Sequence, residues 1–492
     1  MNRREFLKNA SIFTVGNMLL PNLSFGAQDE WLKQFNQNLK NKPWLIGLQG
    51  INKDQIQSSN IKIEGKIPKE INGYLYRNGP ANNQPFNTRY HHWFDGDGMV
   101  QQFHINAGKV SHLGKMIKTH KYLSEKQQQK NIYPTFGTSK KTRFKSADEL
   151  NVSNISLLPI NKQLFSLWEG GSAYEIAPKT LDTIGIKTWS AKTKGVPFGA
   201  HYRKDKDGSI WNIGYASLND AIVLWHIDKY AKLKKTKILP IKNVPMLHDF
   251  LITEKYIILV LHPYNFDKNK FKDGYSFLES HQFYKNKETK VWLIDKNTLD
   301  ITHTFELASQ FVFHFVNAYE QKDEIVFESM RYPNANILLD LGNIMKGVTP
   351  TSQLATHHKI RLNLNKNTAK EYQLNKIGSE FPNIIESETG LSHTKMLSLQ
   401  QRGDILFNTV SIMDNITNKS QYFSYANQLA EEHIIIKNHK GSDWVIGTTL
   451  DYKNNNTKLN IFNADYLGDG PIAIATLPYI LPLGLHGKFV YG

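Results

Sequence analysis

Short apolar runs separated by turn-forming residues follow one another along the chain from about Ile61 to the C-terminus. The clearest of them span five or six residues, a length typical of strands and too short for most helices of globular proteins. Clusters such as Lys206-Asp-Gly208 and Asn454-Asn-Asn456 mark turns between them. The pattern predicts an all-β chain folded as a sandwich, a barrel or a propeller. The runs lie at residues 73–77, 163–168, 256–261, 290–294 and 324–328.

Two stretches depart from the strand pattern. One covers residues 127–150, and the other covers residues 333–351, where apolar residues recur at helical spacing. We expect both to form loops or short helices over one end of the β core. No repeat of about 40 to 45 residues with a Trp-Asp signature is visible, so the spacing alone does not give a number of blades.

The N-terminal residues predict an export signal. Arg3-Arg4 begins a twin-arginine pattern, and a weakly apolar stretch then ends in the small residues Ser24 and Gly26. We therefore expect a twin-arginine signal peptide over residues 1–26, a mature domain over residues 27–492, and a protein that is periplasmic or secreted. The alternative is a surface helix with basic flanks. No later apolar run reaches the roughly 18 residues that a membrane-spanning helix needs.

Charge and composition limit the kinds of molecule that this protein is expected to bind. The formal net charge of +16 is spread over lysine-rich loops at residues 204–206, 232–235 and 268–272, without an arginine-rich strip or a nucleic-acid motif. We expect a solvated basic face and no nucleic-acid partner, with peripheral contact to anionic lipids as the alternative. The chain has no cysteine, which excludes disulfides, zinc–cysteine sites and a cysteine nucleophile. Any metal must be held by His, Asp or Glu.

Four of the 18 histidines share one local setting, an apolar strand end next to a turn. A single histidine of this kind is usually a hydrogen-bonded core residue. Four imidazoles buried together without a metal would leave ring nitrogens unsatisfied, at a cost of about 1–3 kcal/mol each. A metal ion would remove that cost. The four are His201, His248, His314 and His486.

The residue types in the sequence limit which metal ion can bind and suggest which residues hydrogen-bond its histidine ligands. Imidazole ligands suit Zn, Cu, Fe or Ni, and the lack of thiolate or thioether motifs disfavours Cu(I). An octahedral Fe(II) ion bound by four neutral ligands would keep two coordination positions open. Each ligating imidazole also needs an acceptor for its other N–H. Glu169 and Glu380, next to Trp168 and Phe381, are candidates, although most glutamates are exposed.

The Asp95-Gly-Asp-Gly98 loop invites a calcium or phosphate interpretation. Two carboxylates and two glycines are too few for a dedicated site, so we expect a tight turn that fixes the closure of the β structure.

Several segments together resemble one known family. The sequence is similar to the carotenoid cleavage oxygenases, including the apocarotenoid- and stilbene-cleaving enzymes of bacteria, from about Pro43 to the C-terminus. The motifs occur in the order found in that family. They are Tyr76-Arg-Asn-Gly-Pro80, His92-Trp-Phe-Asp-Gly-Asp-Gly-Met99, Leu167-Trp-Glu-Gly-Gly171, Leu247-His-Asp-Phe250, Phe313-His-Phe-Val-Asn-Ala318, Ser379-Glu-Phe-Pro382 and Leu485-His-Gly487.

The resemblance implies a seven-bladed β-propeller with a helical and loop dome over one axial Fe(2+) per chain. The iron ligands would be the four histidines already singled out. The glutamates that support them would be Glu169, Glu380 and Glu432, with the adjacent Glu431 as a competitor because the family usually has Glu-Pro where this chain has Glu432-His433. Ile155, fourteen residues before Glu169, falls where the family often has a β-branched residue beside the open iron position, and an ordinary core role is the alternative.

The activity implied by the resemblance is O₂-dependent cleavage of a C=C bond in a carotenoid, apocarotenoid or stilbene-type alkene. The alternatives are an iron-dependent polyene isomerase or isomerohydrolase and a non-catalytic periplasmic propeller that binds a ligand or partner. A phenolic substrate would need polar anchors, for which Tyr133, Lys140 and Lys145 lie in the right neighbourhood. A membrane-dissolved substrate is expected to enter past apolar dome residues such as Ile337, Leu338 and Met345.

Overall fold

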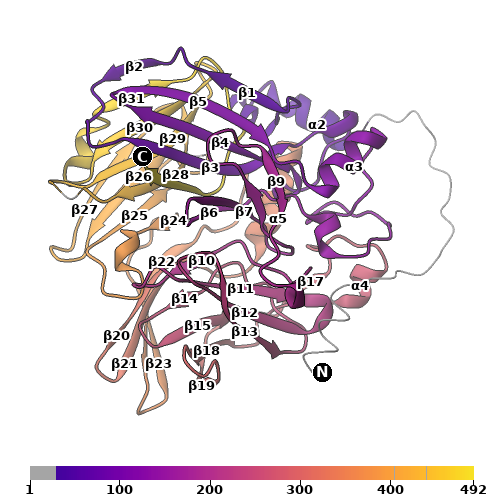
Figure 1. Ribbon diagram of the computed structural model, residues 1–492, viewed down its shortest axis with the longest axis vertical. Helices are drawn as coiled ribbons and strands as arrows, with labels where there is room; N and C mark the ends of the chain where they lie inside the picture. The colour runs from indigo at the N-terminus through magenta and orange to yellow at the C-terminus, as the bar shows by residue number, and fades with distance from the viewer. Residues whose placement is uncertain (1–28, 404, 439) are drawn as a thin grey trace.

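The apolar runs form the strands of antiparallel sheets arranged around one axis, as the computed structural model of this chain shows for residues 29–403, 405–438 and 440–492 (Figure 1). Seven of the sheets in this part of the chain have four or five strands and are the blades of a propeller. The first strands of neighbouring blades, such as β14 and β20, contact one another and therefore surround the axis. The predicted all-β, seven-bladed fold is confirmed.

From the axis outward, the first four blades have the following strands. Blade 1 has β32 (Gly487–Tyr491), β3 (Gly73–Asn82), β4 (Asp97–Asn106), β5 (Lys109–Met116) and β1 (Gln55–Ser58); blade 2 has β6 (Ser156–Ile160), β7 (Gln163–Leu167), β8 (Tyr174–Ile176) and β9 (Thr183–Ile186); blade 3 has β10 (Tyr202–Lys204), β11 (Ile210–Ala216), β12 (Ala221–Ile227) and β13 (Leu233–Pro240); blade 4 has β14 (Leu251–Ile252), β15 (Tyr256–Leu261), β18 (Thr289–Asp295) and β19 (Ile301–Leu307).

The remaining blades follow in chain order. Blade 5 has β20 (Phe311–Gln321), β21 (Glu324–Tyr332), β22 (Thr356–Asn363) and β23 (Thr368–Gln373); blade 6 has β24 (Ser379–Asn383), β25 (Lys395–Gln400), β26 (Thr409–Asp414) and β27 (Lys419–Ser424); blade 7 has β28 (Gln428–Ile436), β29 (Trp444–Asp451), β30 (Asn456–Asn463), β31 (Ala473–Thr476) and β2 (Lys62–Gly65).

Burial along the strands explains the sequence pattern. Strands in the middle of a blade, such as β11 and β12, are buried at every position because neighbouring blades cover both of their faces. They therefore read as continuous apolar runs. Outer strands such as β23 and β27 alternate between half-buried and exposed positions.

The two ends of the chain close the ring. The C-terminal strand β32 pairs with β3 of blade 1, and the N-terminal strand β2 pairs with β31 at the outer edge of blade 7. Figure 1 shows the indigo N-terminal strands beside the yellow C-terminal ones. Blade 1 and blade 7 therefore each contain strands from both the N-terminal and the C-terminal part of the described chain.

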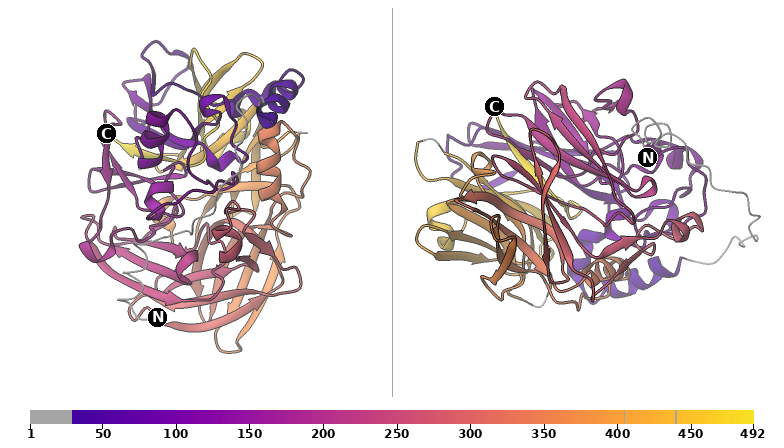
Figure 2. Two further views of the ribbon diagram at one scale, coloured as in Figure 1. Left: turned by 90° about the vertical axis from the view of Figure 1, so that its right-hand side faces the viewer. Right: turned by 90° about the horizontal axis from the view of Figure 1, so that it is seen from below.

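Helices and long connections gather on one side of the propeller, at the right in Figure 1 and in the right-hand view of Figure 2. Both predicted interruptions of the strand pattern, residues 127–150 and residues 333–351, contribute to this dome, as expected. Its elements are α2 (Glu30–Leu39), α3 (His120–Gln128), α4 (Lys268–Lys272), α5 (Asn336–Asn343) and the hairpin of β16 (Tyr264–Phe266) and β17 (His281–Phe283).

The Asp95–Gly98 loop ties the dome to blade 1. Asp95 accepts hydrogen bonds from the backbone N–H of Gly137 (2.8 Å) and the hydroxyl of Thr138 (2.7 Å). Asp97 accepts one from the buried ammonium of Lys121 in α3 (3.0 Å). Protein donors already satisfy both carboxylates. The expected tight turn is confined to residues before Asp97, because Asp97 and Gly98 begin strand β4 and pair with β3.

The dome residues past which a membrane-dissolved substrate is expected to enter are buried and form no membrane-facing surface, although Ile337 lines a cavity. Ile337 and Leu338 of α5 and the following Met345 point into the protein core, because the apolar stripe of α5 packs against the propeller. The exposed apolar residue of this helix is Leu339, with 57% of its surface accessible. None of the helices in the described ranges is long and apolar enough to cross a membrane. The predicted signal peptide, residues 1–26, lies outside the described residues.

Candidate metal centre

The four predicted histidines occupy equivalent places in four blades. His201 immediately precedes β10, His248 lies three residues before β14, His314 is in β20, and His486 immediately precedes β32. Each of these strands is the innermost of its blade. The propeller therefore brings side chains up to 285 positions apart in the sequence to one point near its axis.

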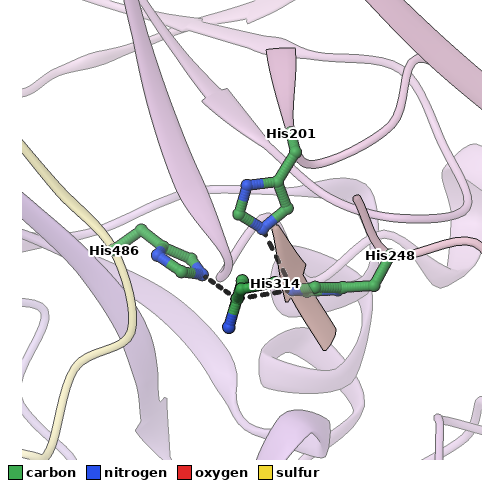
Figure 3. Close-up of side chains that lie close together, drawn as sticks. All are labelled: His201, His248, His314 and His486. Carbon is green, nitrogen blue, oxygen red and sulfur yellow. Dashed lines mark hydrogen bonds between the residues drawn. The ribbon is translucent and has the colours of Figure 1, made fainter. Parts of the chain in front are cut away.

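The imidazoles face one another through their Nε2 atoms (Figure 3). The Nε2–Nε2 distances are 3.0 Å from His201 to His248, 3.1 Å from His248 to His314 and 3.2 Å from His314 to His486. The ligand atoms of all four lie within 4.8 Å of one another. This is the separation expected of donors that share one ion with bonds of about 2.0–2.1 Å.

Three of the four imidazoles are held at Nδ1 by a buried carboxylate. His314 donates to Glu380 (2.6 Å), His486 donates to Glu432 (3.0 Å), and His248 donates to Glu169. A carboxylate accepts only, so Nδ1 carries the proton in each of these rings. The Nε2 atoms of the three then present lone pairs toward the common centre.

Two of the three glutamates also come from the innermost strand of a blade. Glu380 lies in β24 of blade 6 and Glu432 in β28 of blade 7, and Glu169 follows β7 of blade 2. The geometry distinguishes the two adjacent candidates of blade 7, because Glu432 contacts His486 whereas Glu431 binds Arg77.

Burial keeps two of the histidines in the neutral form that binds metals. Removal from water, followed by the neighbouring imidazoles, holds the pKa of His201 and His314 well below the usual value. Burial acts in the same direction on His248, but the Glu169 carboxylate outweighs it and raises the pKa of His248. Burial raises the pKa of Glu380 to about 7, despite the hydrogen bonds that it accepts.

These residues fit a single divalent cation. Lone pairs on neighbouring Nε2 atoms only about 3 Å apart repel one another unless a cation or proton lies between them. A buried oxygen of Glu169 has no hydrogen-bond partner among the described residues, and a nearby dication would stabilise this carboxylate in its charged form. Four neutral nitrogen donors with three carboxylates behind them suit a metal such as Fe, Zn or Ni.

Two apolar cavities reach the histidines, and we call them the first and second arms. The first arm is lined by Ile155, Glu169 and His248, and by six phenylalanines. The second is lined by Phe313, Phe381, His314 and His486, and by further aromatic and aliphatic residues. Phe94 and His248 line both arms. The metal centre therefore lies where two apolar channels approach each other.

Ile155 is buried and packs with Ala200 and Leu485 next to the first arm.

The three residues considered as anchors for a phenolic substrate lie outside both arms. Tyr133 contacts His120 (3.2 Å), and Lys145 is exposed. Lys140 lines a smaller cavity at the outer end of the first arm, sharing Phe144 and Phe271 with it. None of the three lines either arm.

Sequence reasoning missed the residues that hold the segment before His486. The guanidinium of Arg77 binds the Glu431 carboxylate and donates to the carbonyl of Pro482 (2.8 Å), and Glu431 accepts from the backbone N–H of Gly484 (2.6 Å). Arg77 belongs to the Tyr76–Pro80 motif, and the sequence gives no role for this arginine. The paired acids Glu431 and Glu432 are the sequence signal for this contact.

Fold and site together define a seven-bladed propeller protein with an axial four-histidine metal centre. A family model described as RPE65, retinal pigment epithelial membrane protein, matches residues 52–491. The chain belongs to this family, that of the carotenoid cleavage oxygenases.

Individual relatives agree with this assignment. The chain is similar to carotenoid 9,10(9',10')-cleavage dioxygenase 1 of Pisum sativum, with 25% identity over 91% of this chain and 90% of that protein. It is also similar to resveratrol cleavage oxygenase 1 of Aspergillus fumigatus, with 24% identity over 88% and 92%. A solved structure of a Glu150Asp mutant of the apocarotenoid oxygenase of Synechocystis superposes with a TM-score of 0.84 at 22% identity, covering 92% of this chain and 99% of that one.

Proposed function

We propose that this protein is a non-haem Fe(II) oxygenase that cleaves a C=C bond of a conjugated alkene with O₂ to give two carbonyl products. The observation that carries the proposal is the position of the four converging Nε2 atoms at the junction of two apolar arms. An elongated apolar alkene that occupies both arms would place an internal double bond beside them.

The residues have distinct parts in this reaction. His201, His248, His314 and His486 would hold the iron, which when bound would supply the site of O₂ activation. The carboxylates of Glu169, Glu380 and Glu432 keep the proton on Nδ1 and leave Nε2 free. The side chains of Phe94 and Phe313 line the arms at the histidines and exclude water.

The net reaction needs no reductant. One C=C bond and one O₂ molecule give two C=O groups, so both oxygen atoms appear in the products and every electron is accounted for. The side chain of Ile155 would limit the shape of a substrate that approaches the histidines through the first arm. The substrate is proposed to be a carotenoid, an apocarotenoid or a stilbene-type alkene.

Product mass spectrometry tests this proposal. Iron-loaded protein is given an apocarotenal and a hydroxystilbene together under O₂, with an anaerobic control, and aldehydes are expected from one of them only under O₂. An isomerised alcohol in place of aldehydes would favour an isomerase or isomerohydrolase. Neither iron binding nor O₂ uptake would be expected of a non-catalytic binding propeller.

We also propose export by the twin-arginine pathway to the periplasm or the medium, on the basis of residues 1–26 alone. Replacing Arg3 and Arg4 by Lys is expected to retain the protein in the cytoplasm with an unshortened N-terminus. Cell fractionation with mass spectrometry of the N-terminus measures both effects. Equal export of the Lys-Lys variant and the wild type would contradict the proposal.

A further inference from the structure

Aromatic side chains line both arms, but the two arms differ in what accompanies them. The second arm combines its aromatic residues with many aliphatic ones, among them Ile337, Leu354 and Leu429. Phenylalanines dominate the first arm, and their rings meet at tilted or edge-to-face angles, with centroids 5.2 Å apart for Phe266–Phe277 and 5.7 Å for Phe136–Phe277. The six are Phe94, Phe136, Phe144, Phe266, Phe271 and Phe277. Such a wall favours a flat aromatic group.

Two hydroxyl groups interrupt this aromatic wall. Tyr215 is the second-last residue of β11, and Ser217 begins the turn that follows that strand. Their side chains are almost fully buried, with 4% and 7% of the residue surface exposed, and both line the first arm. They lie on one wall of the arm because they come from neighbouring positions of blade 3.

The Ser217 hydroxyl has no protein partner, because it is buried without a hydrogen bond to any described residue. The Tyr215 phenol lines the same arm. A buried polar group without a partner costs about 1–3 kcal/mol. Thr135, by contrast, is engaged in its own turn, where its hydroxyl accepts from the backbone N–H of Thr138 (3.3 Å).

The phenol of Tyr215 remains a hydrogen-bond donor at any physiological pH, because burial and the nearby Glu169 carboxylate raise its pKa. Other polar side chains, among them Thr135, Glu169 and Asn219, also line the arm. A ligand oxygen held against the aromatic wall would hydrogen-bond the Tyr215 and Ser217 hydroxyls and bury an aromatic ring in the same step.

We propose that the first arm binds an oxygen-substituted aromatic ring, a phenol or methoxyphenol, whose oxygen hydrogen-bonds Tyr215 and Ser217. This inference rests on the proposed function in treating the arm as the substrate site, and it names the substrate class. The ring would point outward along the first arm, and the apolar remainder of the alkene would extend past the histidines into the second arm.

Binding of uncleavable analogues tests the inference separately from catalysis. The probes are 4-hydroxybibenzyl and bibenzyl, which lack the alkene between their rings and differ by one hydroxyl. Dissociation constants are measured by calorimetry on the metal-loaded protein. The wild type is expected to bind the hydroxylated probe about 5- to 30-fold more tightly, as one or two net hydrogen bonds allow. A wild-type ratio near one, or no binding of the hydroxylated probe, would overturn the inference without any variant.

Substitutions of the two residues test whether their hydroxyl groups cause the preference for the hydroxylated probe. Tyr215→Phe and Ser217→Ala are each expected to lower the ratio about fivefold at most, and the double variant should bring it close to one. Tyr264→Phe, which removes a buried phenol outside both arms, is expected to keep the wild-type ratio. A double variant that folds and retains the wild-type ratio would contradict the assignment. If discrimination is as expected but no alkene is cleaved under O₂, the proposed function fails while the binding site stands.

Discussion

Each histidine of the centre depends on a group that fixes its ring. Carboxylates hold the rings of His248, His314 and His486 from behind, but His201 has no carboxylate partner among the described residues. The three carboxylates stabilise a dication that four neutral imidazoles cannot neutralise. Removal of a histidine ligand should therefore have a different effect from removal of the carboxylate behind it.

Replacing His314 by Ala is expected to lower the bound metal from about one ion per chain to close to none, because one of four donors is lost and a buried carboxylate is left behind. Metal analysis of the purified protein by mass spectrometry measures this. His303→Ala, in the outermost strand of blade 4, is the matched control and should bind metal normally. Full metal content in the His314 variant would refute the ligand assignment.

Replacing Glu380 by Gln is expected to keep most of the metal while lowering metal affinity or turnover by about 10–100-fold. The amide is nearly isosteric with the carboxylate but carries no charge to offset the ion. A chelator competition series gives the affinity. An unchanged affinity together with an unchanged rate would show that this carboxylate does not act on the metal.

At the scale of elements, the segment over residues 482–486 must be fixed because it carries His486 to the axis. Strand β3 holds it from one side, where Leu485 donates to the carbonyl of Asn78 (2.8 Å) and Asn78 donates to the carbonyl of His486 (2.9 Å). Strand β28 holds it from the other side through Glu431 and Glu432. The buried pair of Arg77 and Glu431, each with 3% of its side chain exposed, joins the two strands.

Replacing Glu431 by Gln is expected to lower the free energy of unfolding by about 3–5 kcal/mol, because the buried Arg77 guanidinium loses its counter-charge. Metal affinity should fall as well, since the bond to Gly484 weakens. Urea unfolding and metal titration measure the two effects.

The double variant Arg77→Met with Glu431→Leu is the control for this pair. It removes both charges, so it should recover much of the stability. It should not recover metal affinity, because the backbone groups of Pro482 and Gly484 remain without these partners. Recovery of both would show that the pair does not position His486.

For the whole molecule, burial of histidines makes stability depend on pH. Burial lowers the pKa of His92, His112 and His262 to about 3, against an unfolded value of about 6.5. The unfolded chain therefore binds more protons than the folded chain between about pH 3 and 6.5, and stability must rise with pH in that window. Each of these histidines contributes about 1.4 kcal/mol per pH unit well below pH 6.5.

We expect the urea midpoint of the metal-free protein to fall steadily from pH 7 to pH 5. His262→Phe keeps the volume of the ring and removes one titrating group, so its slope with pH should be smaller by about one proton. The slope is compared between variants, because the substitution is also expected to lower stability at every pH. Identical slopes for the variant and the wild type would contradict this account.

Much of the fold and of the site could be predicted from particular residues. The continuous apolar runs of strands such as β12 and β15 are dictated by burial on both faces, and that requirement is visible in the sequence. The four histidines were recognisable because they share a local setting at strand ends. The motifs around them then pointed to a family with a known number of blades, which the spacing of strands did not give.

Other features depend on contacts between segments far apart in the chain, and sequence patterns do not record such contacts. The inward direction of Ile337, Leu338 and Met345 is decided by the face that the propeller covers. The choice of Glu432 over Glu431 depends on the local backbone of β28, whose pairing with β29 shifts register between Ala430 and His433, and there one acid contacts His486 and the other Arg77. The sequence by itself determined an all-β chain with a candidate four-histidine metal centre. Only the tertiary structure decided that two apolar arms meet there and that Tyr215 and Ser217 line one of them, because a cavity is formed by side chains that have no common sequence pattern.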